Sequence, residues 1–89
     1  MKYNIDMFEI IKTGTFEDWL LKLKDRMAVA RIQARIRYLS IGHLGDCKPV
    51  CDGVSELRIN HGPGYRVYFM RSGPLVIVFG WWRQIHTGC

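Results

Sequence analysis

The spacing of apolar residues changes once along this chain, and the change limits the folds that are open to it. From Phe16 to Leu39 apolar side chains recur every three or four residues, as in a helix packed on a core. From Val54 to Phe79 they alternate or run together between glycine-rich turns, which is typical of strands. The pattern predicts an α+β domain, with two helices packed on one face of a small, mainly antiparallel sheet.

Local signals place the expected elements along the chain. Thr15 to Asp18 have the spacing of a capping box, which predicts that the first helix begins there. Gly42 is placed to end the second helix. Residues 75–79 are apolar on both faces, which predicts a strand that is covered on both sides. The expected elements are a strand within 4–12, a second helix over 27–41, a loop over 42–53, and strands at 54–59, 65–71 and 75–79.

Length and composition narrow the class of protein. The 89 residues allow one domain, spanning 1–89, and a hydrophobic fraction of 48% is too high for a disordered tail. Three cysteines cannot all pair, which favours a reduced protein. The first ten residues include Asp6 and Glu9 and do not resemble a signal peptide, and no apolar run is long enough to span a bilayer. We therefore expect a soluble cytoplasmic protein.

Charge is distributed unevenly along the chain. The formal net charge is +5, and every acidic residue lies at or before Glu56. Arg58, Arg66, Arg71 and Arg83 follow with no acid among them. An arginine-bearing segment without acids suggests a surface for a polyanion such as nucleic acid. The alternative is a small basic domain without a specific anionic ligand.

Arg66 is the first candidate for a phosphate ligand. It lies in mid-strand on the same face as Tyr68, where we expect the open face of the sheet. Its planar guanidinium suits phosphate, and Arg58 on the preceding strand could lie beside it across the hairpin. The alternative is an arginine that faces solvent or pairs with Glu56.

Other chemistry has weaker support in the sequence. His43, Cys47 and Cys51 are spaced like metal ligands, but they occupy a turn-rich segment without a second ligand pair, so we expect no metal. Cysteines that fill apolar space are the preferred interpretation. His61 and His86 could act as a general acid or base, or be ordinary turn and terminal residues. Stacking of bases on Trp81 and Trp82 competes with core or partner packing.

Three segments together resemble a known family. They are FEDWLLKLKDRMAVARIQARI at 16–36, GHLGDCKPVCDGVSELRI at 42–59 and GPGYRVYF at 62–69. The order of their GDxKP, GVxELR and GPGYRVYF elements resembles the RelE/ParE superfamily of toxins from type II toxin–antitoxin systems. The closest resemblance is to the HigB-like branch of phage-derived addiction-module killer proteins.

The resemblance implies a microbial RNase-like fold and a ribosome-dependent mRNA endoribonuclease (an mRNA interferase) that needs no cofactor. In such enzymes the 2′-hydroxyl attacks the adjacent phosphate. Arg66 matches the arginine that binds the scissile phosphate, and Lys48 and Arg58 match basic positions that contact RNA or the ribosome. Two further sets complete the expected site: Arg83 and His86 as catalytic candidates after the last strand, and Arg31 and Arg35 as RNA contacts on the second helix.

The resemblance also implies partners and leaves alternatives open. The expected partners are a helix-turn-helix antitoxin, mRNA on the ribosome, and operator DNA through the antitoxin alone, with no membrane. The segment GWWRQIH departs from the family's GGDK element, so we regard the C-terminal end as atypical or truncated. The alternatives are therefore a ParE-like inhibitor of DNA gyrase, or an inactive remnant that still binds antitoxin.

Overall fold

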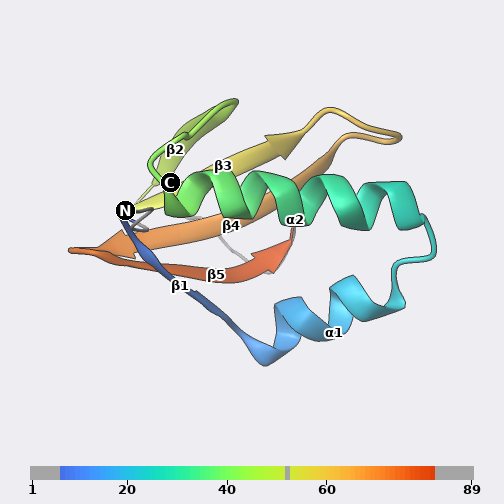
Figure 1. Ribbon diagram of the computed structural model, residues 1–89, viewed down its shortest axis with the longest axis horizontal. Coiled ribbons are helices and arrows are strands. Elements are labelled where there is room, and N and C mark those ends of the chain that lie inside the picture. The colour runs from blue at the N-terminus through green and yellow to red at the C-terminus, as the bar shows by residue number, and fades with distance from the viewer. Residues whose placement is uncertain (1–6, 52, 82–89) are drawn as a thin grey trace, which may run out of the picture.

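A strand and two helices precede four further strands in the described chain (Figure 1). The structure is a computed structural model, and it describes residues 7–51 and 53–81. Within these ranges, no helix is both long enough and apolar enough to cross a membrane. The elements are β1 (Glu9–Lys12), α1 (Gly14–Lys22), α2 (Arg26–Ser40), β2 (Cys47–Cys51), β3 (Val54–Ile59), β4 (Tyr65–Ser72) and β5 (Leu75–Trp81).

The strands form one sheet in the order β1-β5-β4-β3-β2. β2, β3, β4 and β5 follow one another as an antiparallel meander, whereas β1 pairs in parallel with β5. Short turns can join antiparallel neighbours, but the parallel pair needs the long connection that α1 and α2 supply. The predicted α+β class and the antiparallel order of β3, β4 and β5 are confirmed.

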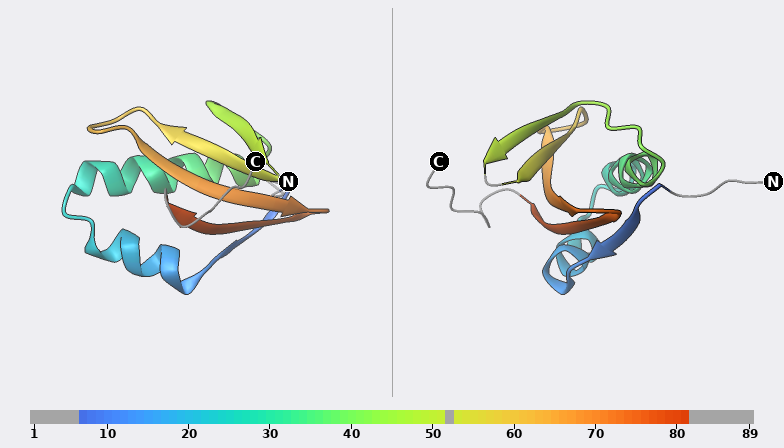
Figure 2. Two further views of the ribbon diagram at one scale, coloured as in Figure 1. Left: turned by 180° about the vertical axis from the view of Figure 1, so that it is seen from behind. Right: turned by 90° about the vertical axis from the view of Figure 1, so that its left-hand side faces the viewer.

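Both helices lie on the same side of the sheet (Figure 2). Phe16 of α1 and Ile32 of α2 are completely buried, and they belong to one core cluster with Leu57, Val67 and Val78 of the sheet. Burial of an apolar side chain of this size contributes roughly 1.5–3 kcal/mol relative to exposure. The helical stripe seen in the sequence therefore forms the core against one face of the sheet.

The first helix has its N-cap two residues before Thr15, where the predicted capping box begins. Its N-cap is Thr13, whose Oγ1 accepts a hydrogen bond from the Phe16 amide at 3.2 Å. The Thr13 amide donates to the Val78 carbonyl at 3.0 Å, which ties Thr13 to β5 in an extended conformation. The prediction at Thr15 was wrong because pairing with the sheet determines where strand β1 gives way to helix.

The second helix, expected over 27–41, begins and ends one residue earlier, at Arg26 and Ser40. Asp25 is its N-cap, and its Oδ1 accepts from the Ala28 amide at 3.1 Å. At the other end Gly42 has φ +90° and its amide donates to the Leu39 carbonyl at 3.0 Å. The His43 amide donates to the Tyr38 carbonyl at 2.9 Å, which completes a Schellman motif. Gly42 thus ends the helix as predicted.

Two predictions about the strands were wrong. The segment 42–53 is not all loop, because Cys47–Cys51 forms β2 and pairs with β3. Pro49 is tolerated there because β2 is an edge strand, and the register shifts between Pro49 and Cys51. In β5, Val76 and Val78 are buried whereas Leu75 and Ile77 are half-buried, so one face alone is fully covered.

Candidate nucleic-acid interface

The face of the sheet opposite the helices carries charged side chains from three strands. Arg58 of β3 lies directly opposite Arg66 of β4, as the sequence predicted for this hairpin. Two residues earlier in β3 and on the same face, Glu56 lies between Lys48 of β2 and Tyr68 of β4. Antiparallel register therefore gathers three cations, one acid and one phenol on neighbouring positions of the same face.

Glu56 is at the centre of this group, which we call the Glu56 cluster (Glu56, Arg58, Arg66 and Tyr68). Arg58 Nε donates to Glu56 Oε1 at 3.0 Å, and the Tyr68 hydroxyl donates to Oε2 at 3.1 Å. Arg66 Nη1 lies 3.7 Å from Oε2, within range of an ion pair. The pairing of Arg66 with Glu56, an alternative in the sequence analysis, is therefore present alongside the two-arginine arrangement.

The surroundings shift three ionisations in the cluster. Burial raises the pKa of Glu56, but the hydrogen bonds from Arg58 and Tyr68 and the nearby Arg66 charge outweigh it, so the pKa is lowered overall. Burial, with Glu56 as hydrogen-bond acceptor, raises the pKa of Tyr68. The hydrogen bond to Glu56 raises the pKa of Arg58. At neutral pH the cluster thus holds a carboxylate, two guanidinium ions and a neutral phenol.

A groove of about 220 Å³ adjoins the two arginines. Arg58 and Arg66 form one part of its lining, and the β3–β4 turn, with Asn60 and Gly64, forms another. Asp46 also contributes to the lining. A phosphate in this groove would meet two planar guanidinium forks, which can bind its oxygens in pairs and spread its charge.

The two candidate arginines of α2 do not join this cluster. Arg31 is exposed on the helix that covers the other face of the sheet. Arg35 donates to the backbone carbonyl oxygens of Arg58, Leu44 and Asp46. Its guanidinium thus joins the segment before β2 to the end of β3, which is a scaffold role, and the contact of Arg35 with RNA stays a prediction.

The remaining candidates are spread more widely. Lys48 is exposed on the edge strand β2, beside Glu56 in register. Arg71 lies over the Phe8 ring, 4.6 Å from its centroid, and its Nε donates to the Gly73 carbonyl, so it is engaged at the far turn. The predicted roles of Arg83, His86 and Trp82 concern positions outside the described residues.

The histidine and cysteine candidates have structural surroundings. His61 Nε2 lies 3.1 Å from Asp25 Oδ2, which ties the β3–β4 turn to the start of α2. Cys47 is a free thiol that packs against the core, and burial raises its pKa. Within 7–51 and 53–81, no three His, Cys, Asp or Glu side chains come together as a set that could hold a metal ion.

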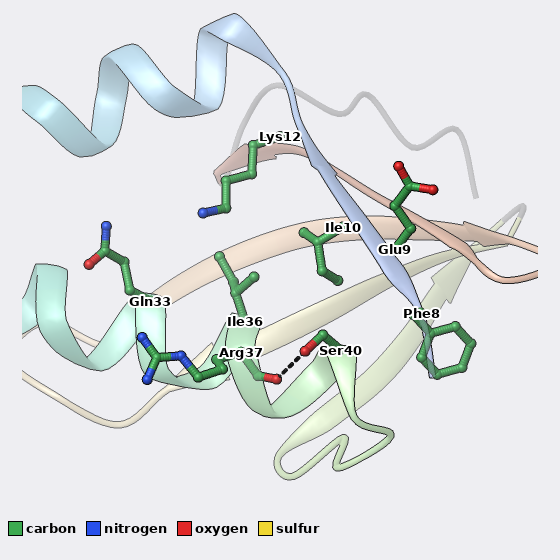
Figure 3. Close-up of a pocket in the computed structure, with 8 residues that line it drawn as sticks. All are labelled: Phe8, Glu9, Ile10, Lys12, Gln33, Ile36, Arg37 and Ser40. Carbon is green, nitrogen blue, oxygen red and sulfur yellow. Dashed lines mark hydrogen bonds between the residues drawn. The ribbon is translucent and has the colours of Figure 1, made fainter. Parts of the chain in front are cut away.

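A second groove, of about 540 Å³, lies between β1 and α2 (Figure 3). Lys12 of β1 and Gln33 and Arg37 of α2 lie toward one end of it, and Phe8 lies toward the other. Neither Lys12 nor Arg37 forms an ion pair with a described residue. Glu9 also lines this groove, so apolar, cationic and acidic side chains meet there, away from the Glu56 cluster.

The central position of Glu56 was not predicted from the sequence. From the sequence, Glu56 was a possible partner of Arg66 alone, and Tyr68 only marked the strand face that Arg66 shares. Alternation within β3 does place Glu56 and Arg58 on one face, opposite Tyr68 and Arg66. That register was the available signal, and it becomes informative once the hairpin between the two strands is fixed.

Comparison with known proteins relates the chain to one sequence and one fold. No protein-family model matches it. A Haemophilus influenzae protein described as uncharacterized is 52% identical over 71 residues, which cover 79% of this chain and 72% of that protein. The structure of the YoeB dimer from Staphylococcus aureus matches with a TM-score of 0.67 and 13% identity, over 91% of this chain and 99% of that chain. By sequence, this chain belongs to the family of the Haemophilus influenzae protein, and its fold is that of the YoeB toxin.

Proposed function

We propose that this protein is a toxin of a type II toxin–antitoxin module and cleaves mRNA on the ribosome. YoeB, whose fold it shares, is a RelE/ParE-superfamily toxin, and this supports the superfamily. The GPGYRVYF segment, which contains Arg66, supports the HigB-like branch within it. Because unrelated activities can share a fold, the case for RNA rests on the site.

The pairing of Arg58 with Arg66 is the observation that carries the proposal. Two like charges directly opposite on a sheet disfavour one another, and an anion that binds both would relieve this repulsion. Glu56 compensates them in part, and a phosphodiester in the adjoining groove would add the remaining negative charge. No acidic residue follows Glu56 in the sequence, so this segment carries a net positive charge that attracts a polyanion.

The proposed reaction is an in-line displacement at phosphorus. The 2′-oxygen forms a bond to the phosphorus while the bond to the 5′-oxygen breaks, leaving a 2′,3′-cyclic phosphate. The 2′-hydroxyl gives its proton to a base, and the departing 5′-oxygen takes one from an acid. Arg66 and Arg58 would stabilise charge on the phosphoryl oxygens. Lys48 would contact RNA or the ribosome, and Arg83 and His86 remain our proposals for the rest of the site.

The proposed partner is a helix-turn-helix antitoxin, through which the complex would bind operator DNA. YoeB pairs with an antitoxin, which supports a protein partner for this fold. The groove between β1 and α2 supports it as well, because its lining mixes apolar side chains with the charged Glu9, Lys12 and Arg37 and lies apart from the Glu56 cluster. We propose a cytoplasmic location, because the proposed target is mRNA on the ribosome.

Replacement of Arg66 by Ala is the sharpest test of the RNA proposal. Expression of the wild-type chain should arrest growth and produce primer-extension stops within codons of translated mRNA. R66A should relieve the arrest and remove the stops, while binding of the antitoxin stays within about twofold because Arg66 is a single exposed side chain. R26A, which removes an equal charge from an exposed position at the start of α2, should behave as wild type.

The same experiment separates the alternative functions. Gyrase-dependent DNA breaks without cuts in mRNA would favour a ParE-like inhibitor and contradict the proposed cleavage. A chain that binds its antitoxin but leaves growth, mRNA and DNA intact would be an inactive remnant. Full toxicity of R66A would contradict the assignment of Arg66 to the phosphate.

A further inference from the structure

Glu56 is a buried carboxylate on the face of the sheet away from the helices, where its neighbours Arg58 and Arg66 are partly exposed. It is 7% exposed, and Ser40 is the other polar residue that is buried in the described part of the chain. Burial of a charge is costly unless partners surround it, so a carboxylate at this position needs a specific reason. The cleavage step proposed above assigns it none.

The three partners of Glu56 hold it unequally. Arg58 and Tyr68 each make a hydrogen bond to a different carboxylate oxygen, at 3.0 and 3.1 Å. Arg66 is 3.7 Å away, beyond hydrogen-bond distance, and its side chain is 56% exposed. Two partners are therefore fixed by the carboxylate, and the third lies close to it without being fixed.

We propose that Glu56 is a positioning residue, which fixes Arg58 and Tyr68 and keeps Arg66 close but free to transfer to the substrate phosphate. This inference rests on the proposed function, because it takes an RNA phosphodiester as the anion that receives Arg66. Arg58 binds Glu56 through Nε, so its two terminal nitrogens are left for an anion in the groove that both arginines line. An incoming phosphate would then replace the Glu56 carboxylate as the ionic partner of Arg66.

Positioning fits Glu56 better than a role as general base. Both of its oxygens already accept hydrogen bonds, and the arginine charges favour the carboxylate form. A carboxylate so stabilised is a weak proton acceptor. The two roles differ in the effect of Gln, which preserves the size of the side chain and an oxygen acceptor but removes the charge.

The test compares E56Q with E17Q, which removes an equal charge from an exposed position in α1. Steady-state cleavage of mRNA on ribosomes should show kcat lowered about tenfold in E56Q, since Arg58 and Tyr68 are held less firmly. KM should fall about fivefold, because removal of a negative charge near the phosphate strengthens its binding. E17Q should leave both constants unchanged.

Two further measurements keep the inference testable if E56Q folds poorly. E56D keeps the charge but withdraws the carboxylate from its partners, so it should lower kcat with little change in KM. The pKa of Tyr68, followed by NMR of labelled tyrosine and assigned with Y68F, should fall in E56Q because it loses its anionic partner. A tyrosine pKa unmoved by E56Q would contradict the cluster itself.

The outcomes distinguish this inference from the function on which it rests. An unchanged kcat in E56Q and E56D would overturn the positioning role, as would a loss of about a thousandfold or more in E56Q, which would indicate a general base. If the wild-type protein cleaves no mRNA, the proposed function fails. The positioning role of Glu56 is then tested by binding of a 2′-deoxy-substituted RNA oligonucleotide. Tighter binding by E56Q than by the wild-type protein supports replacement of Glu56 by phosphate at Arg66, and equal binding contradicts it.

Discussion

Arg35 lies on the helix side of the sheet, yet it contacts backbone next to the Glu56 cluster on the other side. From α2 it donates to the carbonyls of Leu44, Asp46 and Arg58, and so joins the segment before β2 to the end of β3. Gly45 makes this approach possible, because a Cβ there would lie 2.9 Å from Arg35 Nη2. Its φ of +63° also favours glycine. The groove beside Arg58 therefore depends on a residue that does not line it.

Replacement of Arg35 by Met tests this scaffold role. Loss of charge-assisted hydrogen bonds to three carbonyls should lower the free energy of unfolding by about 2 kcal/mol. Urea denaturation would measure the change, with R31M on the exposed side of the same helix as the control. R31M should stay within about 0.5 kcal/mol of wild type. Equal stability of the two variants would contradict the scaffold role.

At the scale of elements, the junction between β1 and α1 depends on Thr13. Its amide pairs with the Val78 carbonyl, its hydroxyl donates to the Phe79 carbonyl at 3.2 Å, and the same oxygen accepts from the Phe16 amide. One residue therefore ends the strand, caps the helix and attaches both to β5. This explains why a threonine two positions later, with equally good local spacing, is not the cap.

The two threonines provide a matched pair of variants. T13A should destabilise the protein by about 1–2 kcal/mol, since it removes a cap and a second hydrogen bond. T15A, in the first turn of α1, should change the free energy of unfolding by less than about 0.5 kcal/mol. Chemical denaturation of both proteins gives the comparison. A larger loss of unfolding free energy in T15A than in T13A would indicate that Thr15 is the N-cap, as the sequence predicted.

Elements with a strong local pattern could be predicted from the sequence, and those defined by distant partners could not. The helical stripe through Phe16, Ile32 and Leu39 identified both helices because burial on one face requires that spacing. β2 was missed because Pro49 and the flanking glycines signal turns, whereas its strand conformation comes from pairing with β3. The same holds for the candidate site. The Arg58–Arg66 pair could be predicted from the hairpin, whereas the burial of Glu56 could not, because it depends on the side chains around it.

At the scale of the whole molecule, stability should depend on acid in a predictable direction. Hydrogen bonding from the Ala28 amide is the largest cause that lowers the pKa of Asp25, and the pKa of Glu56 is lowered too. Both carboxyls thus hold protons less tightly in the folded state than in the unfolded chain. Their contribution is fully present above their ordinary pKa values of 3.8 and 4.5, and is lost as the pH falls through the lower folded values.

Urea midpoints measured from pH 7 to pH 3 test this expectation. The wild-type midpoint should be nearly constant above pH 5 and then fall. E56Q should start from a lower midpoint and lose less of it on acidification, because one of the two responsible carboxyls is absent. The exposed-site control E17Q should retain the wild-type slope. Parallel acid losses in wild type and E56Q would contradict the assignment to Glu56.

The parallel pairing of β1 with β5 affects how the protein folds during its synthesis. The ribosome synthesises β1 early, yet its sheet partner is the last strand that the structure describes, and the Thr13 junction needs Val78 and Phe79. Until β5 emerges, β1 and the start of α1 have no sheet to join. The β3–β4 hairpin can pair before β5 is made, whereas the β1–α1 junction can form only after β5 has been synthesised.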